Sequence, residues 1–256
     1  MMIIALPLLL ASTPSGDAPM QVLRLNRRPD SQRVYRIEQS SQFGNRAGMT
    51  LSILLREHVH EVSEGRARIE RRLEQIELAE PGPQNDLIKS LAGISWRGWV
   101  DRRGQWEGLV LSRTEDKSKL LQPLLKELQN LPAGGAFVLP EEPVAVGSTW
   151  KIPATELLKP TRRNAQTTEG NVICTLLSLQ SQIATIQLKL DAHLGTAKDQ
   201  RRGKAEGTGQ IVIDLASGFL QRFELESTMK LNANVAGKLE MHLLRSRVAM
   251  FCETTR

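Results

Sequence analysis

Apolar and polar residues alternate along most of the chain from Gln32 onward. In segment 48–62, "GMTLSILLREHVHEV", one face carries Met49, Leu51 and Ile53, and the residues between them are mostly polar. In segment 185–194, "TIQLKLDAHL", apolar side chains again occupy every second position. A period of two with one apolar side is typical of antiparallel sheets that have one buried face and one wet face.

The longest run of this pattern covers residues 219–235, far beyond the usual strand of about 5–6 residues. Its apolar positions include Phe219, Phe223, Leu225, Met229 and Leu231. A flat strand of this length would not pack on a compact core, whereas a strongly twisted sheet accepts it with the apolar face turned inward. We therefore expect a mainly β protein, a curved antiparallel sheet or half-barrel of about ten strands.

Two hairpins of similar sequence indicate an internal duplication. "WVDRRGQWEGLVL" and "IVIDLASGFLQRFEL" share an apolar residue, an aspartate, a turn that ends in glycine, and a strand. Asp101 corresponds to Asp214 and Gly104 to Gly218, at a nearly constant separation. In such turns aspartate accepts hydrogen bonds from turn amides and glycine supplies a positive φ. Two hairpins with turns of a common type are the alternative to a duplicated unit of four or five strands.

Helical spacing is confined to short segments. Between the two halves, "SKLLQPLLKELQNLP" forms a leucine stripe from Leu120 to Leu131, and Pro123 restricts the main helix to about 122–130. We expect this amphipathic helix to cover the concave face of the sheet. A shorter helix is expected within 84–93, ending at Gly93. Segment 66–78 suits a helix or a strand, and we predict a strand because it follows a hairpin-like "SEG".

The N-terminus reads as a targeting segment. An apolar run from Met2 to Ala11 is followed by small and polar residues, which predicts a signal peptide over residues 1–18 with cleavage near Ala11 or Ala18. No lysine or arginine precedes the run. A buried first strand is the alternative, but three prolines within residues 7–19 argue against it. The remaining prediction is one β-rich domain over 30–256, with halves at about 30–131 and 148–256 and a linker at 132–147.

Composition narrows the range of partners. The net charge is +6, but the basic residues are scattered pairs interspersed with acids, and aromatic residues make up only 4% of the 256 residues. Binding of nucleic acid normally needs a dense basic track or stacking aromatics, so we expect no nucleic-acid partner. The surplus of positive charge leaves peripheral contact with an anionic envelope surface open.

Catalytic and metal-binding patterns are missing from the sequence. His58 and His60 would lie on one side of a strand as two metal ligands, but both fall on the polar face without a third ligand nearby, so we expect no metal. No nucleophile elbow or phosphate loop occurs, and we expect neither a cofactor nor catalysis. Cys174 and Cys252 could form a bridge in an oxidising compartment, although Cys174 lies in an apolar run and suits a buried thiol.

Two motifs resemble a known family. "LPEEPVAVGSTW" (139–150) and "GTGQIVIDLASGFL" (207–220) are similar to those of a family of uncharacterised secreted bacterial β-rich proteins that share a domain of unknown function. The plan is also similar to the half-barrel of periplasmic lipoprotein carriers. The resemblance implies a fold and a compartment, and it implies no catalytic residue.

The expected function is therefore that of a periplasmic or extracellular, non-enzymatic protein that holds a lipid or another apolar ligand in its concave face. The alternatives are a structural or interaction module of the cell envelope with a filled core, and an enzyme with unrecognised residues. The residues expected to line the concave face are Met49, Leu51, Ile53, Leu124, Leu128, Phe219, Phe223, Leu225, Met229 and Leu231.

Overall fold

The computed structural model describes residues 19–44, 48–80, 85–104, 106–111, 139–154, 166–195, 202–235 and 238–253. These residues form an 11-stranded sheet and one short helix. In chain order the elements are β1 (Gln32–Phe43), β2 (Met49–Ser63), β3 (Arg66–Leu78), α1 (Asn85–Lys89), β4 (Ser95–Asp101), β5 (Trp106–Leu111), β6 (Thr149–Pro153), β7 (Gln166–Gln180), β8 (Ile183–Gly195), β9 (Arg202–Asp214), β10 (Phe219–Val235) and β11 (Lys238–Glu253).

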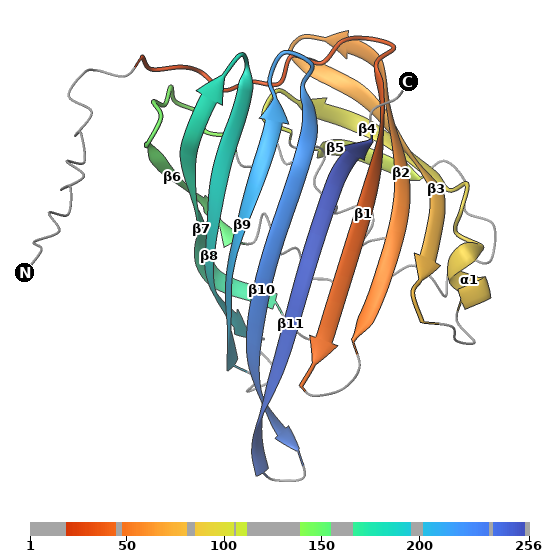
Figure 1. The fold of residues 1–256 in the computed structure, drawn as a ribbon, viewed down its shortest axis with the longest axis vertical. Helices are drawn as coiled ribbons and strands as arrows, with labels where there is room; N and C mark the ends of the chain where they lie inside the picture. The colour runs from red at the N-terminus through yellow and green to blue at the C-terminus, as the bar shows by residue number, and fades with distance from the viewer. Residues whose placement is uncertain are drawn as a thin grey trace, which may run out of the picture.

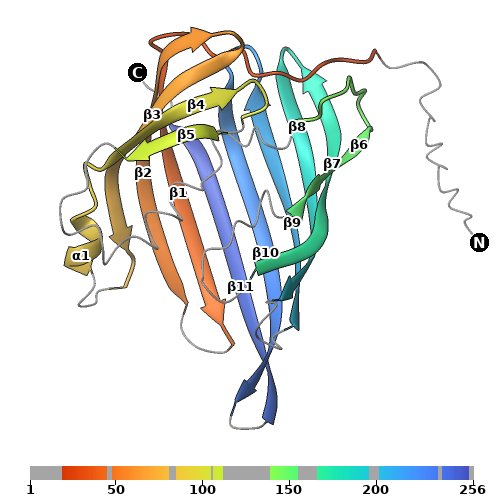
Figure 2. The same ribbon diagram turned by 180° about the vertical axis from the view of Figure 1, so that it is seen from behind.

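The sheet is an open half-barrel. Its strand order is β5-β4-β3-β2-β1-β11-β10-β9-β8-β7-β6, and all neighbours are antiparallel. The first and last strands therefore pair in the middle of the sheet. The two ends bend toward the same side, with β3 to β5 on one rim and β6 and β7 on the other (Figures 1 and 2). This confirms the predicted curved antiparallel sheet.

The long strand predicted at 219–235 is present as β10, but its phase is interrupted near the start. The register between β9 and β10 shifts between Leu220 and Arg222, which is typical of a β-bulge. As a result Leu220 is buried beside Phe219, while Gln221, which the strict alternation places on the apolar face, is exposed. From Phe223 onward the expected alternation holds.

The two aspartate–glycine turns have the predicted structure. In the turn between β4 and β5, a carboxylate oxygen of Asp101 accepts hydrogen bonds from the amides of Arg103 and Gly104. In the turn between β9 and β10, Asp214 accepts from the amides of Ala216 and Ser217. Gly104 and Gly218 have φ of 95° and 71°. These shared turns do not test the duplication, which stays a prediction.

The helical predictions have different outcomes. Segment 66–78 is the strand β3, as predicted, and the helix expected within 84–93 is α1, followed by Gly93 with a positive φ. The leucine-rich helix at 120–131, the signal peptide at 1–18 and the first part of the linker, residues 132–138, lie outside the described residues. Within the part of the chain that is described, no helix is long and apolar enough to span a bilayer.

One end of the half-barrel is closed by the segment that precedes β1. The backbone of Leu25 donates to Arg102 in the turn between β4 and β5, and Asn26 donates to Leu215 in the turn between β9 and β10. Gln21 forms an isolated bridge with Val144. The segment thus ties both halves of the sheet together and places Leu23 and Leu25 in the core. At the opposite end the β10–β11 hairpin extends beyond its neighbours (Figure 1).

Candidate functional site

The concave face of the sheet carries a continuous apolar wall. Following the sheet across from β3 through β2, β1, β11, β10, β9 and β8 to β7, the register aligns one inward residue on each strand. Every residue of this row is buried. The row consists of Ile76, Ile53, Ile37, Met250, Phe223, Ile211, Ile186 and Leu176. A contiguous apolar surface of this kind provides the hydrophobic driving force for folding or for binding an apolar chain.

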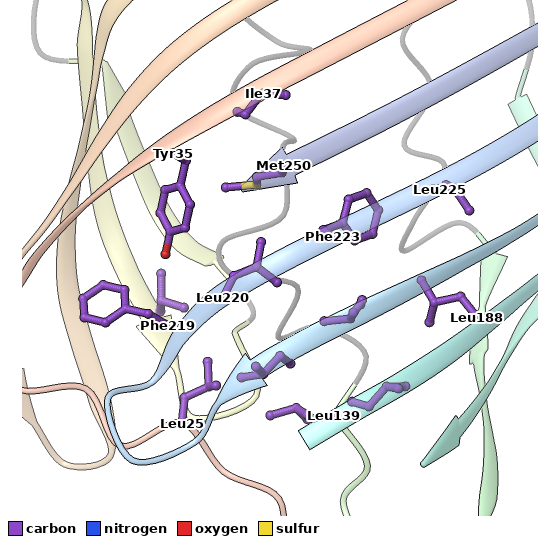
Figure 3. Close-up of a cluster of buried hydrophobic side chains, with 14 of the residues drawn as sticks. Leu25, Tyr35, Ile37, Leu139, Leu188, Phe219, Leu220, Phe223, Leu225 and Met250 are labelled. Atoms are coloured by element: carbon purple, nitrogen blue, oxygen red, sulfur yellow. The ribbon is translucent and has the colours of Figure 1, made fainter. Parts of the chain in front are cut away.

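The closed end of the half-barrel adds side chains from outside the sheet. Leu25 from the N-terminal segment and Leu139 belong to the same buried cluster as Phe219 and Leu220, and Figure 3 draws all four among its side chains. All four are part of one buried cluster that includes the apolar wall. The hollow is therefore lined from the sheet and capped at this end by the chain itself.

Most of the predicted lining residues meet on this wall. Leu51, Ile53, Phe219, Phe223 and Leu225 are buried members of the cluster. Met229 is partly buried against it, whereas Met49, at the start of β2, is 53% exposed. Leu231 pairs with His242 on the backbone of the projecting hairpin. Leu124 and Leu128 lie outside the described residues.

Sequence reasoning missed a buried ion pair on the same face. Glu57 and Arg71 are register neighbours on β2 and β3, and both side chains are 0% exposed. Arg71 Nε donates to Glu57 Oε2 at 2.9 Å, and Nη2 lies 2.9 Å from the same oxygen. The signal was available, because Glu57 falls between Leu55 and Val59, and Arg71 between Ile69 and Leu73, on the apolar phase of each strand.

Further polar groups surround this pair. Trp96 is the register neighbour of Arg71 on β4, and the Arg71 guanidinium carbon lies 5.3 Å from the Trp106 ring centroid. Arg27 is buried here as well, and burial lowers the pKa of its guanidinium, which the Glu57 carboxylate partly offsets. Burial, followed by the Glu57 charge, raises the pKa of Tyr35 well above its ordinary value, so its hydroxyl stays protonated.

Several polar atoms of this region have no hydrogen-bond partner among the described residues. They are Tyr35 Oη, Glu57 Oε1, Trp96 Nε1 and Trp106 Nε1, all buried. Buried polar groups in native proteins are normally paired with protein, ordered water or ligand. The end of the hollow near β1 to β4 is therefore suited to polar groups, in contrast to the apolar wall beside it.

A cavity of about 520 Å³ lies at the same end of the molecule, where β11 stops short of the ends of β1 and β10. Its lining includes Arg33, Phe219, Leu220 and Cys252. In the register of the sheet, Arg33 neighbours Glu57 and Cys252 neighbours Tyr35. Phe219 and Leu220 belong to the buried cluster. The cavity therefore borders both the polar region and the apolar wall.

A larger groove of about 980 Å³ crosses the middle of the sheet. Most of its lining side chains have the outward phase, among them Lys189, Thr208 and Arg247. Lys204 beside it lies 2.7 Å from Glu206 and 3.4 Å from Asp191, and Arg247 lies 3.6 Å from Glu226. The groove is thus lined by basic and acidic side chains that lie next to one another.

The described histidines and cysteines lie apart from the apolar wall or are buried singly. The His58 and His60 rings contact each other at a tilt of 58° on the outward side of β2, with centroids 4.1 Å apart, and His60 Nε2 lies 3.0 Å from Glu70 Oε2. Within the described residues no group of three or more potential ligands is placed to hold a metal ion. Cys174 and Cys252 are both free, and burial raises the pKa of the Cys174 thiol to about 12, which keeps it protonated.

No family model and no curated protein matches the chain. Among solved structures, the chain is similar to the one reported as "Lipid-protein interactions in lipovitellin", with a TM-score of 0.58, 10% identity, and coverage of 90% of this chain and 26% of that chain. The chain thus spans about a quarter of the length of that lipovitellin chain. This similarity shows a shared fold.

Two further solved structures match more loosely. Rv2717c from M. tuberculosis has a TM-score of 0.27 at 10% identity, covering 86% of this chain and 91% of that one. The LolA superfamily protein NE2245 from Nitrosomonas europaea has a TM-score of 0.20 at 7% identity, covering 90% of each. These scores are too low to support an argument. The predicted half-barrel plan is confirmed by the sheet itself, while membership of the secreted β-rich family stays a prediction.

Proposed function

We propose that the protein is a non-enzymatic binding protein that holds the apolar chain of a lipid against the concave face of its half-barrel. The observation that carries the proposal is the unbroken apolar row from Ile76 on β3 to Leu176 on β7. Apolar concave surfaces are the usual sites for such ligands. The fold shared with a structure reported for its lipid–protein interactions supports this choice.

The proposed location is the periplasm or the extracellular space, after removal of the N-terminal segment. The support is the apolar run at Met2 to Ala11 followed by small residues. In such a compartment a lipid requires a protein to shield its chain from water, which is a task for a soluble carrier.

A second function is favoured by the depth of burial on the same wall. The members of the apolar row are already almost fully excluded from solvent. This suits a structural or protein-interaction module of the cell envelope whose core is filled by its own chain.

A binding assay with a matched pair of variants distinguishes the two. We expect the protein purified without detergent to carry a lipid mass in native mass spectrometry, and to enhance the emission of phenylnaphthylamine after delipidation. Val248 lies inward and partly buried against the wall, while Arg247 beside it is exposed on the outward side. Val248→Trp should weaken probe binding several-fold by filling space in the hollow, and Arg247→Trp should leave it unchanged. Absence of both the bound mass and the probe signal would favour the filled-core module.

A further inference from the structure

We propose that the cavity at the end of β11 binds the anionic head group of a single-chain amphiphile, with Arg33 as the cation and Tyr35 as a hydrogen-bond donor. The inference rests on the proposed function, because it assigns a head-group site to the ligand whose chain lies on the apolar wall. The cavity lies at the edge of the wall: Phe219 and Leu220 of the buried cluster line it together with Val212 and Phe251 from the outward side. One molecule placed there can reach the wall through Phe219 and Leu220.

The charge of the cavity favours an anion. Its charged lining residues are Arg33, Asp214 and Arg222. Both oxygens of Asp214 accept hydrogen bonds within its own turn, from the Ala216 and Ser217 amides and the Ser217 hydroxyl. Arg222 pairs with Glu224 at 2.9 Å. This leaves Arg33 as the lining charge that has no carboxylate within ion-pair distance among the described residues.

Arg33 is held in position for this role. It is half-buried, and its guanidinium carbon lies 4.6 Å from the centroid of the Phe219 ring. Its Nη1 donates to the Gln32 carbonyl, which leaves other N–H groups of the planar fork for a ligand. An arginine stacked on an aromatic ring and partly desolvated recognises a carboxylate or phosphate better than a fully hydrated one.

Tyr35 supplies the second, independent observation. The side chain is fully buried and its hydroxyl has no hydrogen-bond partner among the described residues. In Figure 3 the hydroxyl points from the wall toward Phe219, the residue on which Arg33 stacks. Because the hydroxyl stays protonated, it donates to an anionic oxygen placed beside Arg33.

The path for the chain follows from the neighbours of the site. Phe219 and Leu220 line the cavity and belong to the buried cluster with Phe223 and Leu225 further along β10. At about 3.3 Å per residue, the inward face of β1 from Tyr35 to Ser41 spans roughly 20 Å. Its inward residues nearest the site are Tyr35 and Ile37, whereas Gln39 and Ser41 beyond them are polar. An extended acyl chain therefore finds its apolar surface along the row that crosses the sheet through Ile37, Met250 and Phe223.

The test compares amphiphiles that differ only in their head groups. Dodecanoate, dodecanol and dodecyltrimethylammonium are titrated at about pH 8, where the carboxylate is ionised, against the protein loaded with phenylnaphthylamine. We expect dodecanoate to displace the probe with a Kd about tenfold below those of the other two. Acetate at the same concentration should not displace it, which separates an amphiphile site from a site for a free anion.

Two variants assign the preference to the proposed residues. Arg33→Gln should raise the Kd for dodecanoate to that for dodecanol without changing the latter, and Tyr35→Phe should weaken dodecanoate a few-fold. Arg36→Gln is the matched control, because Arg36 is an exposed residue of β1 that pairs with Glu253. Equal affinities for the three head groups, or an equal effect of Arg33→Gln and Arg36→Gln, would overturn the inference while leaving lipid binding intact. If even dodecanol fails to displace the probe, the proposed function itself is wrong.

Discussion

Glu57→Gln is expected to lower the free energy of unfolding by about 3–5 kcal/mol, the range typical of losing one partner of a buried ion pair. The variant leaves the Arg71 guanidinium, 0% exposed, without the carboxylate that lies 2.9 Å away. The destabilisation comes from a buried charge that has lost its bond to the Glu57 carboxylate, rather than from the net strength of the pair. Urea denaturation followed by tryptophan fluorescence measures the change.

Two controls make this expectation specific. Glu253→Gln removes one partner of the exposed Arg36–Glu253 pair and should cost at most about 1 kcal/mol. The double variant Glu57→Leu with Arg71→Met removes both charges and should recover most of the lost stability, because apolar replacements of buried pairs are often neutral. A loss for Glu57→Gln no larger than that for Glu253→Gln would show that the pair is not buried as described.

The second large effect is expected for Gly209→Ala, at about 2–3 kcal/mol of lost stability, in the range of an overpacked core. Gly209 lies on the inward face of β9, opposite Leu225 on β10. A Cβ on this residue would lie 2.3 Å from the Glu224 carbonyl oxygen and 3.1 Å from Leu225 Cα. Both neighbours are backbone atoms of β10, so the two strands would have to separate where the sheet bends.

Thr208→Ala is the matched control for this glycine. Thr208 is the preceding residue of β9 and its side chain is exposed on the outward side. Its replacement should change the free energy of unfolding by no more than about 0.5 kcal/mol. Equal midpoints for Gly209→Ala and the unaltered protein would mean that β9 and β10 do not approach as closely as the structure places them.

The two-residue period was sufficient to predict the sheet and its buried face. Ile53, Phe223 and Leu225 were assigned to the concave side because alternation determines the side of a strand on which a residue lies. The interruption at Leu220 could not be predicted, because a bulge arises from pairing with β9, and no local pattern marks it. The pairing of β1 with β11 likewise depends on contacts between the two ends of the chain.

The candidate head-group site was not predicted for a related reason. Arg33 and Tyr35 lie on β1, whereas Phe219 lies at the start of β10, and β11 between them ends opposite Val34 and Arg222, before the first residues of either neighbour. Such a site can be located only when the strand order and the strand lengths are known. Glu57 and Arg71, by contrast, could have been found as opposite charges on the apolar phases of consecutive strands.

Photo-crosslinking with a fatty acid that carries a diazirine near the end of its chain tests the central claim most directly. After irradiation and proteolysis, mass spectrometry identifies the labelled residues. Binding in the hollow predicts labels on inward residues such as Ile37, Ile53 and Phe223, and their loss when unlabelled fatty acid is added in excess. Labels confined to outward residues of the polar groove, such as Lys189, Thr208 and Arg247, would contradict the account.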